Sequence, residues 1–223
     1  MADFDNEELS RVRQWWAANG NALMIGVLVG LIVIAAWGGW NWYQNRQAAA
    51  AADISAQIEG ALVNGAIDNS VVEAVERLEN DYSGTPYATG AALGLASAYV
   101  ADSEYDKAMP HLDWAVDNAS EEGMRHIARV RKARLLWTQD DAEAALTLLE
   151  TDHPAAFDAL YAEVAGDIHA ARGDREAAHQ AYQRALDALP QDTPRQPLQN
   201  KLADNAPTDD AGAGSEQESA SAS

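Results

Sequence analysis

The dominant feature of the hydrophobic pattern is one uninterrupted apolar segment near the N-terminus. No charged residue stands between Arg13 and Arg46, and the apolar centre of this stretch covers residues 22–43. A helix of these 22 residues is about 33 Å long, against about 30 Å for the hydrocarbon core of a bilayer. The pattern predicts a transmembrane helix over residues 22–43. Aromatic side chains that fit the two membrane interfaces flank it, namely Trp15, Trp16, Trp37, Trp40, Trp42 and Tyr43.

A cleaved signal peptide is the alternative for this segment. Its apolar region would have about 7–15 residues and a closely following A-x-A site. Here the polar residues 44–47 separate the apolar run from the match at Ala48–Ala50, so we expect an uncleaved anchor. Two arginines precede the span and one follows it within 20 residues. This small difference favours a cytoplasmic N-terminal segment over residues 1–21.

Two glycines within the span could form a contact surface for another helix. Gly26 and Gly30 are four residues apart and share one helix face. Small residues at this spacing allow two membrane helices to approach closely. Chance spacing in a glycine-rich span is the alternative, and we keep Gly26 and Gly30 as candidates for helix packing.

Residues 44–200 show a repeating pattern of small and large positions. The clearest unit covers residues 161–190, where the spacing of Gly, Ala, aromatic and Pro positions matches the tetratricopeptide pattern. Gly173 is expected to end the first helix of this unit in a left-handed turn. Pro190 is expected to stop the second helix. The positions that carry the match are Gly166, Gly173, Ala178, Tyr182, Ala185 and Pro190.

Two further units lie upstream in the same phase. One has Ala96, Tyr99, Ala108 and Ala115 at the packing positions, with Ser103 in place of the turn glycine. The other is weaker, and its second helix is expected to end early, near residue 149. The units begin near residues 89, 126 and 159, so their spacings of 37 and 33 bracket the period of about 34. We predict an all-α protein in which a transmembrane helix precedes three to four tetratricopeptide-like hairpins; an ordinary helical bundle is the alternative.

The chain is strongly acidic, with a net charge of −20. Residues 48–223 hold 31 Asp and Glu against 12 Lys and Arg. Such a surface repels nucleic-acid phosphates and argues against a nucleic-acid partner. It also suggests adaptation to salty surroundings. A measurement of how stability depends on salt concentration tests this hypothesis. Residues 201–223 lack apolar periodicity and are expected to form a disordered acidic tail.

Candidate chemistry is sparse along the chain. There is no cysteine, and no two of the five histidines have the i, i+4 spacing of a helical zinc pair. His169 occupies an aromatic position of the repeat and is expected to pack in the core. Glu163 and Asp167 share a helix face, where a solvated surface is favoured over acid–base chemistry. We therefore expect no catalytic residue, cofactor, metal or small-molecule substrate.

One basic cluster stands out in the acidic domain. The segment 125–134 holds five of the twelve basic residues of the domain. Arg125, Arg129 and Lys132 share a helix face and are candidates for docking an acidic partner segment or lipid head groups. The alternative is compensation by neighbouring acids at Glu121, Glu122, Asp140 and Asp141.

The junction before the span resembles a known family. The segments "RVRQWWAANG" and "WNWYQNRQ" and the hairpin "ARGDREAAHQAYQRAL" are similar to those of the YfgM-like ancillary subunits of the bacterial Sec translocon. Arg13, Trp15, Trp16, Asn19 and Gly20 match the family pattern, whereas Asn21 stands where the family has a basic residue. The likeness covers roughly residues 9–190.

This resemblance implies a location, partners and a role. It implies a bacterial inner-membrane protein with a periplasmic domain over residues 44–200. It also implies association with the SecYEG channel and with a membrane-anchored periplasmic chaperone of the prolyl-isomerase type, so that the chain assists proteins that leave the channel. Two alternatives remain from the residues alone: a scaffold for another envelope complex, and a receptor or regulator whose domain faces the cytoplasm.

Overall fold

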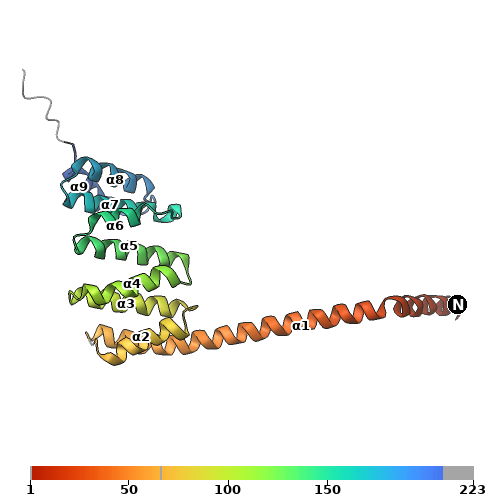
Figure 1. The fold of residues 1–223 in the computed structure, drawn as a ribbon. Coiled ribbons are helices and arrows are strands. Elements are labelled where there is room, and N and C mark those ends of the chain that lie inside the picture. Colours follow the sequence, from red (N-terminus) through yellow and green to blue (C-terminus); the bar gives the residue numbers. More distant parts are fainter. Residues whose placement is uncertain (1, 66, 208–223) are drawn as a thin grey trace, which may run out of the picture. The chain divides into compact units, whose positions relative to one another are not determined.

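The computed structural model describes residues 2–65 and 67–207, and every regular element within them is a helix (Figure 1). The prediction of an all-α chain is thereby confirmed. By contacts the chain divides into two compact units, residues 1–52 and 53–223. The helices are α1 (Ala2–Val63), α2 (Asn69–Asp81), α3 (Pro86–Ala101), α4 (Tyr105–Asn118), α5 (Glu122–Thr138), α6 (Ala142–Leu149), the 3-10 turn η1 (Ala155–Phe157), α7 (Asp158–Ala171), α8 (Arg175–Ala188) and α9 (Gln196–Asp204).

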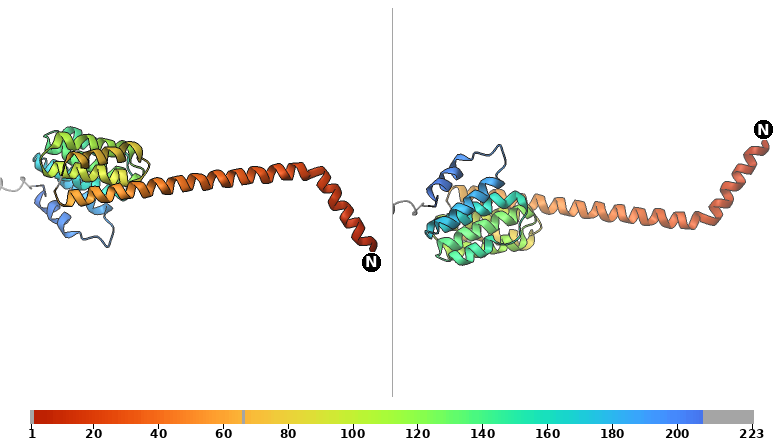
Figure 2. Two further views of the ribbon diagram at one scale, coloured as in Figure 1. Left: turned by 90° about the horizontal axis from the view of Figure 1, so that it is seen from below. Right: turned by 90° about the horizontal axis from the view of Figure 1, so that it is seen from above.

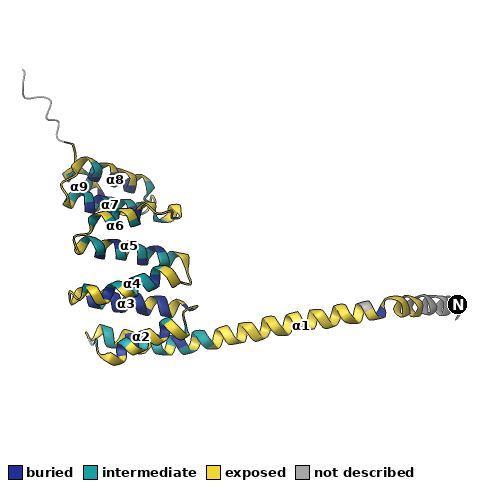
Figure 3. Cartoon of the chain, viewed as in Figure 1, coloured by how far each residue is buried: buried dark blue, intermediate teal, exposed yellow. Residues whose placement is uncertain are grey.

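The N-terminal unit holds helix α1 as far as Ala52, and this part of α1 carries the apolar segment. Within the described residues α1 is the one helix that is long and apolar enough to cross a membrane, by length and composition. Its apolar side chains over residues 23–43 are exposed, as Figure 3 shows. The backbone stays helical through residues 21–22 and 43–44, so no break in α1 marks the expected ends of the span.

The second unit is a stack of helical hairpins (Figures 1 and 2). It begins at Asp53, within α1 and later than the expected boundary at residue 44. Helices α3 and α4, α5 and α6, and α7 and α8 pair as hairpins, and each hairpin packs on the next. The short helix α9 packs on α8 at the end of the stack.

The three hairpin turns share one backbone geometry. Each turn has a left-handed residue two positions beyond the first helix: Ser103 (φ 62°), Asp140 (φ 66°) and Gly173 (φ 81°). The following N–H group donates to a carbonyl five residues back, as in a Schellman motif. These bonds run from Glu104 to Tyr99 (2.8 Å), from Asp141 to Leu136 (3.0 Å) and from Asp174 to His169 (2.9 Å). A single turn conformation therefore repeats although only one of the three residues is glycine.

Small residues form much of the core between the paired helices. A Cβ atom on Gly166 would lie 2.5 Å from Cε1 of Tyr182, so this glycine allows α7 and α8 to approach closely. Pro190 follows the end of α8 at Ala188 and is exposed. Gly173 is exposed in its turn. The structure buries seven further residues of the repeat pattern: Ala96, Tyr99, Ala108, Ala115, Ala178, Tyr182 and Ala185.

The C-terminal end of the stack differs from the expectation. Helix α9 extends to Asp204, so the expected start of a disordered tail at residue 201 is wrong. Leu198 is buried in a cluster with α8 residues, which explains why the chain remains ordered here. Residues 208–223 of the expected tail lie outside the described residues.

Candidate functional site

The short helix α6 leaves a groove in the stack. Helix α6 has eight residues, whereas α4 and α8 have 14 each. Its early end at Leu149, which the sequence predicts, leaves one side of α7 uncovered. A cavity of about 730 Å³ opens there, lined by residues of α6, α7 and α8 together with His153. We call this cavity the α6–α8 groove.

Aromatic side chains from distant parts of the chain meet beside this groove. The ring of His153 stacks on Tyr161 with ring centroids 3.9 Å apart. The Tyr161 hydroxyl lies 2.9 Å from Nδ1 of the buried His126. Phe157 packs against His126 at a centroid distance of 4.8 Å. His153, Phe157 and Tyr161 are four residues apart, but they belong to the segment before η1, to η1 and to α7. His126 comes from α5 and meets Tyr161 only through packing, so the sequence pattern does not reveal this cluster.

The buried members of this cluster are uncharged at neutral pH. Burial, together with the nearby charge of Arg129, lowers the pKa of His126 below its ordinary value. Burial also raises the pKa of Tyr161. Neutral groups that hydrogen-bond each other in a packed setting support the groove wall. Among the described residues no three His, Cys, Asp or Glu side chains gather as a metal site.

The rim of the groove is charged and mostly acidic. Glu150, Asp158 and Asp187 line it, with Arg184 as the basic member. His169 also lines the groove, and its side chain is 24% exposed. His169 is therefore partly buried, and the expectation that it packs in the core is met only in part. An apolar and aromatic cavity with an acidic rim is suited to binding a protein segment.

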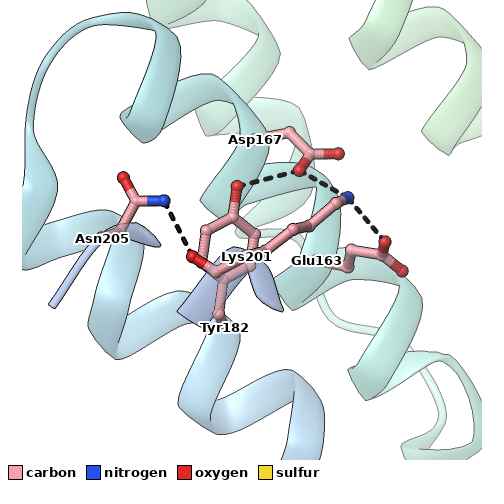
Figure 4. Close-up of polar contacts among 5 residues, drawn as sticks. All are labelled: Glu163, Asp167, Tyr182, Lys201 and Asn205. Atoms are coloured by element: carbon pink, nitrogen blue, oxygen red, sulfur yellow. Dashed lines mark hydrogen bonds and ion pairs between the residues drawn. The ribbon is translucent and has the colours of Figure 1, made fainter. Parts of the chain in front are cut away.

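The acidic pair Glu163 and Asp167 forms a polar network at the end of the stack (Figure 4). Lys201 Nζ lies 2.7 Å from Glu163 Oε1 and 2.7 Å from Asp167 Oδ1. The Tyr182 hydroxyl donates to the same Asp167 oxygen over 2.9 Å, and Asn205 Nδ2 donates to the Lys201 carbonyl over 2.9 Å. The expectation of a solvated carboxylate face is wrong, because α9 places a lysine between the two acids.

The ionisation of this network follows from its packing. Partial burial disfavours the Lys201 ammonium, but its hydrogen bonds to Asp167 and Glu163 prevail and raise the pKa of Lys201. Burial raises the pKa of Tyr182, and the hydrogen bond to Asp167 raises it further. Lys201 is therefore charged and Tyr182 neutral at physiological pH, so the network fastens α9 to α7 and α8.

The expected basic docking face is partly occupied by internal contacts. Arg125 Nη2 donates to the Ala119 carbonyl over 2.9 Å. Lys132 Nζ pairs with Asp113 Oδ1 at 2.6 Å. The contact from Arg129 Nη1 to the Asp152 carbonyl is long, at 3.4 Å. Docking of a partner on Arg125, Arg129 and Lys132 stays a prediction.

None of the acids expected to neutralise this face forms an ion pair with it in the part of the chain that the structure describes. The ion pairs there involve none of Glu121, Asp140 and Asp141. Glu122 Oε1 instead lies 3.9 Å from His126 Nε2. The compensating acid for Lys132 comes from α4, and a sequence pattern does not reveal that pairing.

The large hydrophobic side chains of the expected span are exposed on α1. An added Cβ on Gly26 or Gly30 would meet no atom within 4 Å, so a helix-packing role for this pair stays a prediction. The guanidinium of Arg46 lies over the Trp42 ring, 5.4 Å from its centroid. The aromatic residues that are expected at the membrane interfaces are exposed, Trp37 most of all at 72%, and their interfacial role stays a prediction: Trp15, Trp16, Trp37, Trp40, Trp42 and Tyr43.

Comparison with known proteins places these features in a family. The tetratricopeptide repeat-like domain family matches residues 13–206. An ancillary SecYEG translocon subunit of Neisseria gonorrhoeae is 31% identical over 204 residues, which cover 89% of this chain and 95% of the relative. The subunit of the same name from Escherichia coli is 28% identical over 182 residues, which cover 82% of this chain and 87% of the relative. The subunit of the same name from Haemophilus influenzae is 25% identical over 182 residues, which cover 81% of this chain and 88% of the relative.

The matched region includes both the apolar helix and the hairpin stack. These relatives and the one N-terminal apolar helix fit a single-pass protein of the inner membrane. The tetratricopeptide-like fold is a scaffold type that binds protein segments on its surface. The chain therefore belongs to the family of ancillary SecYEG translocon subunits, with a tetratricopeptide repeat-like domain.

Proposed function

We propose that this chain is a membrane-tethered interaction scaffold that associates with the SecYEG channel and assists proteins that leave it. The observation that supports the proposal is the similarity to named translocon subunits over more than four fifths of the chain. The family match over residues 13–206 includes the apolar helix. The anchor positions the hairpin stack beside the membrane. The α6–α8 groove provides a surface for a segment of another protein. No bond is made or broken.

The domain faces the periplasm in this proposal. Its support is the family resemblance of the junction, together with the excess of arginine before the span. The test is a pair of C-terminal fusions to the full chain, one to alkaline phosphatase and one to green fluorescent protein. Phosphatase activity without fluorescence is expected. Fluorescence without phosphatase activity would instead favour a cytoplasmic receptor or regulator.

The proposed partners are the channel and a membrane-anchored periplasmic chaperone of the prolyl-isomerase type. Gly26 and Gly30 are the proposed contact of the span with a channel helix. A photo-crosslinker at position 26 or 30 is expected to recover channel subunits. The same crosslinker at Leu28 lies on the opposite helix face and serves as the control. Crosslinks to other envelope proteins alone would favour the scaffold of a different complex.

The groove is tested separately from the anchor. Ala162 lines the groove on α7, and the Ala162→Trp variant places a large ring in it. After purification in mild detergent, this variant is expected to retain the channel and lose the chaperone or client proteins. Ala101→Trp, at an exposed position at the end of α3, should retain both. If the wild-type chain recovers no Sec component, the main proposal fails.

A further inference from the structure

Two arginines of the basic segment on α5 lie away from the predicted docking face. Arg131 and Arg134 line a second cavity, of about 320 Å³, between α3 and α5. Arg131 Nη1 donates to Ser97 Oγ over 3.2 Å and to the Leu93 carbonyl over 3.3 Å. Arg134 is exposed and enters no ion pair within the described residues. We call this cavity the α3–α5 pocket.

The α3–α5 pocket combines positive charge with an apolar floor. Ala96, Leu112 and Leu135 are buried and form the floor. The lining residues of the described chain include two guanidinium groups and no carboxylate. This composition is unusual in a chain with 35 Asp and Glu against 15 Lys and Arg. An acidic ligand meets a complementary charge here and is repelled by most of the remaining surface.

The geometry favours a carboxylate next to an apolar side chain. A guanidinium binds a carboxylate through two parallel N–H···O bonds. The contacts of Arg131 with α3 hold its side chain in place before a ligand arrives, which lowers the entropy lost on binding. The floor can accept a Leu- or Phe-sized group beside the carboxylate. Flat lipid surfaces and nucleic acids need broad basic patches instead, whereas residues 48–223 carry 31 Asp and Glu against 12 Lys and Arg.

We propose that the α3–α5 pocket binds an acidic–apolar segment of a partner protein, in which Asp or Glu adjoins a large apolar residue. The carboxylate pairs with Arg131 and Arg134, and the apolar side chain rests on Ala96, Leu112 and Leu135. This inference rests on the proposed function, because it assigns a segment class to the scaffold. The predicted face of Arg125, Arg129 and Lys132 is not required for it.

The test measures peptide binding to the full chain in lipid nanodiscs. The probe is a fluorescent Gly/Ser-rich peptide that contains one Asp-Leu pair, compared with its Asn-Leu twin. We expect the Asp-Leu peptide to bind at least about tenfold more tightly than its twin, as one charge-assisted pair allows. Arg134→Gln should remove most of that difference. Arg77→Gln removes an exposed charge on α2 and should stay within about twofold of wild type.

Several outcomes would overturn the proposal. They are equal binding of the two peptides, no binding of either, and an equal effect of Arg134→Gln and Arg77→Gln. Binding in zwitterionic discs that vanishes in anionic discs would assign the pocket to lipid head groups. Recovery of the channel by both wild type and Arg134→Gln, with unchanged peptide binding, would reject the pocket and leave the proposed function standing. The melting temperature of each variant verifies that it is folded.

Discussion

At the scale of single residues, Gly166 sets how closely α7 and α8 approach. We predict that Gly166→Ala destabilises the domain by about 2 kcal/mol, because overpacking of a core costs roughly 1–3 kcal/mol. The added methyl group would meet the ring of Tyr182, which is 2% exposed and has little room to move. Urea unfolding of the full chain in detergent measures the change.

A matched variant separates packing from helix propensity. Gly90 lies within α3, and an added Cβ there would meet nothing within 4 Å. Gly90→Ala should therefore stabilise the domain by roughly 0.5–1 kcal/mol, as Ala does in a helix interior. Equal effects of the two substitutions would show that the close approach at Gly166 does not limit the packing.

His126 gives the domain a stability that depends on pH. Because burial lowers its pKa below 6.5, the folded chain binds fewer protons than the unfolded chain once the pH falls below about 6.5, so stability declines there. We predict that His126→Gln, which loses the hydrogen bond between His126 and Tyr161, is less stable than wild type at pH 7.5. This gap should narrow by pH 5.5. Urea midpoints at several pH values measure it, and a constant gap would contradict the prediction.

At the scale of elements, α9 depends on the network around Lys201. Lys201→Ala should cost about 1 kcal/mol. The value is modest because the three charged side chains are 24–35% exposed and water screens them. The raised pKa of Lys201 means that this contribution is complete below pH 10.5 and is lost as the pH rises through the folded-state value. Urea unfolding and hydrogen exchange at residues 196–204 measure the loss.

The control for this prediction is a lysine whose ion pair is exposed. Lys107 pairs with Glu104, and the two side chains are 59% and 44% exposed. Lys107→Ala should leave both the urea midpoint and the protection of α9 unchanged. If Lys201→Ala has as little effect as Lys107→Ala, then the apolar contact of Leu198 with α8 suffices to hold α9.

The helices also show how much of the fold can be predicted from the sequence. The hairpins, the turn at Gly173 and the early end of α6 were predictable, because small residues at fixed spacing and a turn glycine are local signals. The left-handed turns at Ser103 and Asp140 carry no such signal. Helix α9 was not, since nine residues rarely form a helix alone and its order comes from Leu198 and Lys201. The cluster of His126, His153 and Tyr161 was hidden for a similar reason, because His126 lies on α5 and meets Tyr161 of α7 only through tertiary packing.

At the scale of the whole molecule, the excess of negative charge should make stability depend on salt. The chain carries a net charge of −20, and this self-repulsion destabilises the compact state. The Debye length is about 10 Å at 0.1 M salt and shorter above it, so added ions screen the repulsion. We predict that the melting temperature of the full chain rises steeply between 0.01 M and about 0.3 M sodium chloride and then levels off.

The form of this rise separates screening from preferential exclusion of the salt. Screening depends on ionic strength alone, so sodium chloride and sodium sulfate at equal ionic strength should give the same curve. Sulfate strengthens apolar burial through its exclusion from the protein surface, and that effect keeps growing at molar concentrations. A melting temperature that is flat up to 0.3 M in sodium chloride and rises only in molar sulfate would show that charge repulsion does not limit stability. In that case the acidic surface would serve solubility alone, and adaptation to salty surroundings would have no support.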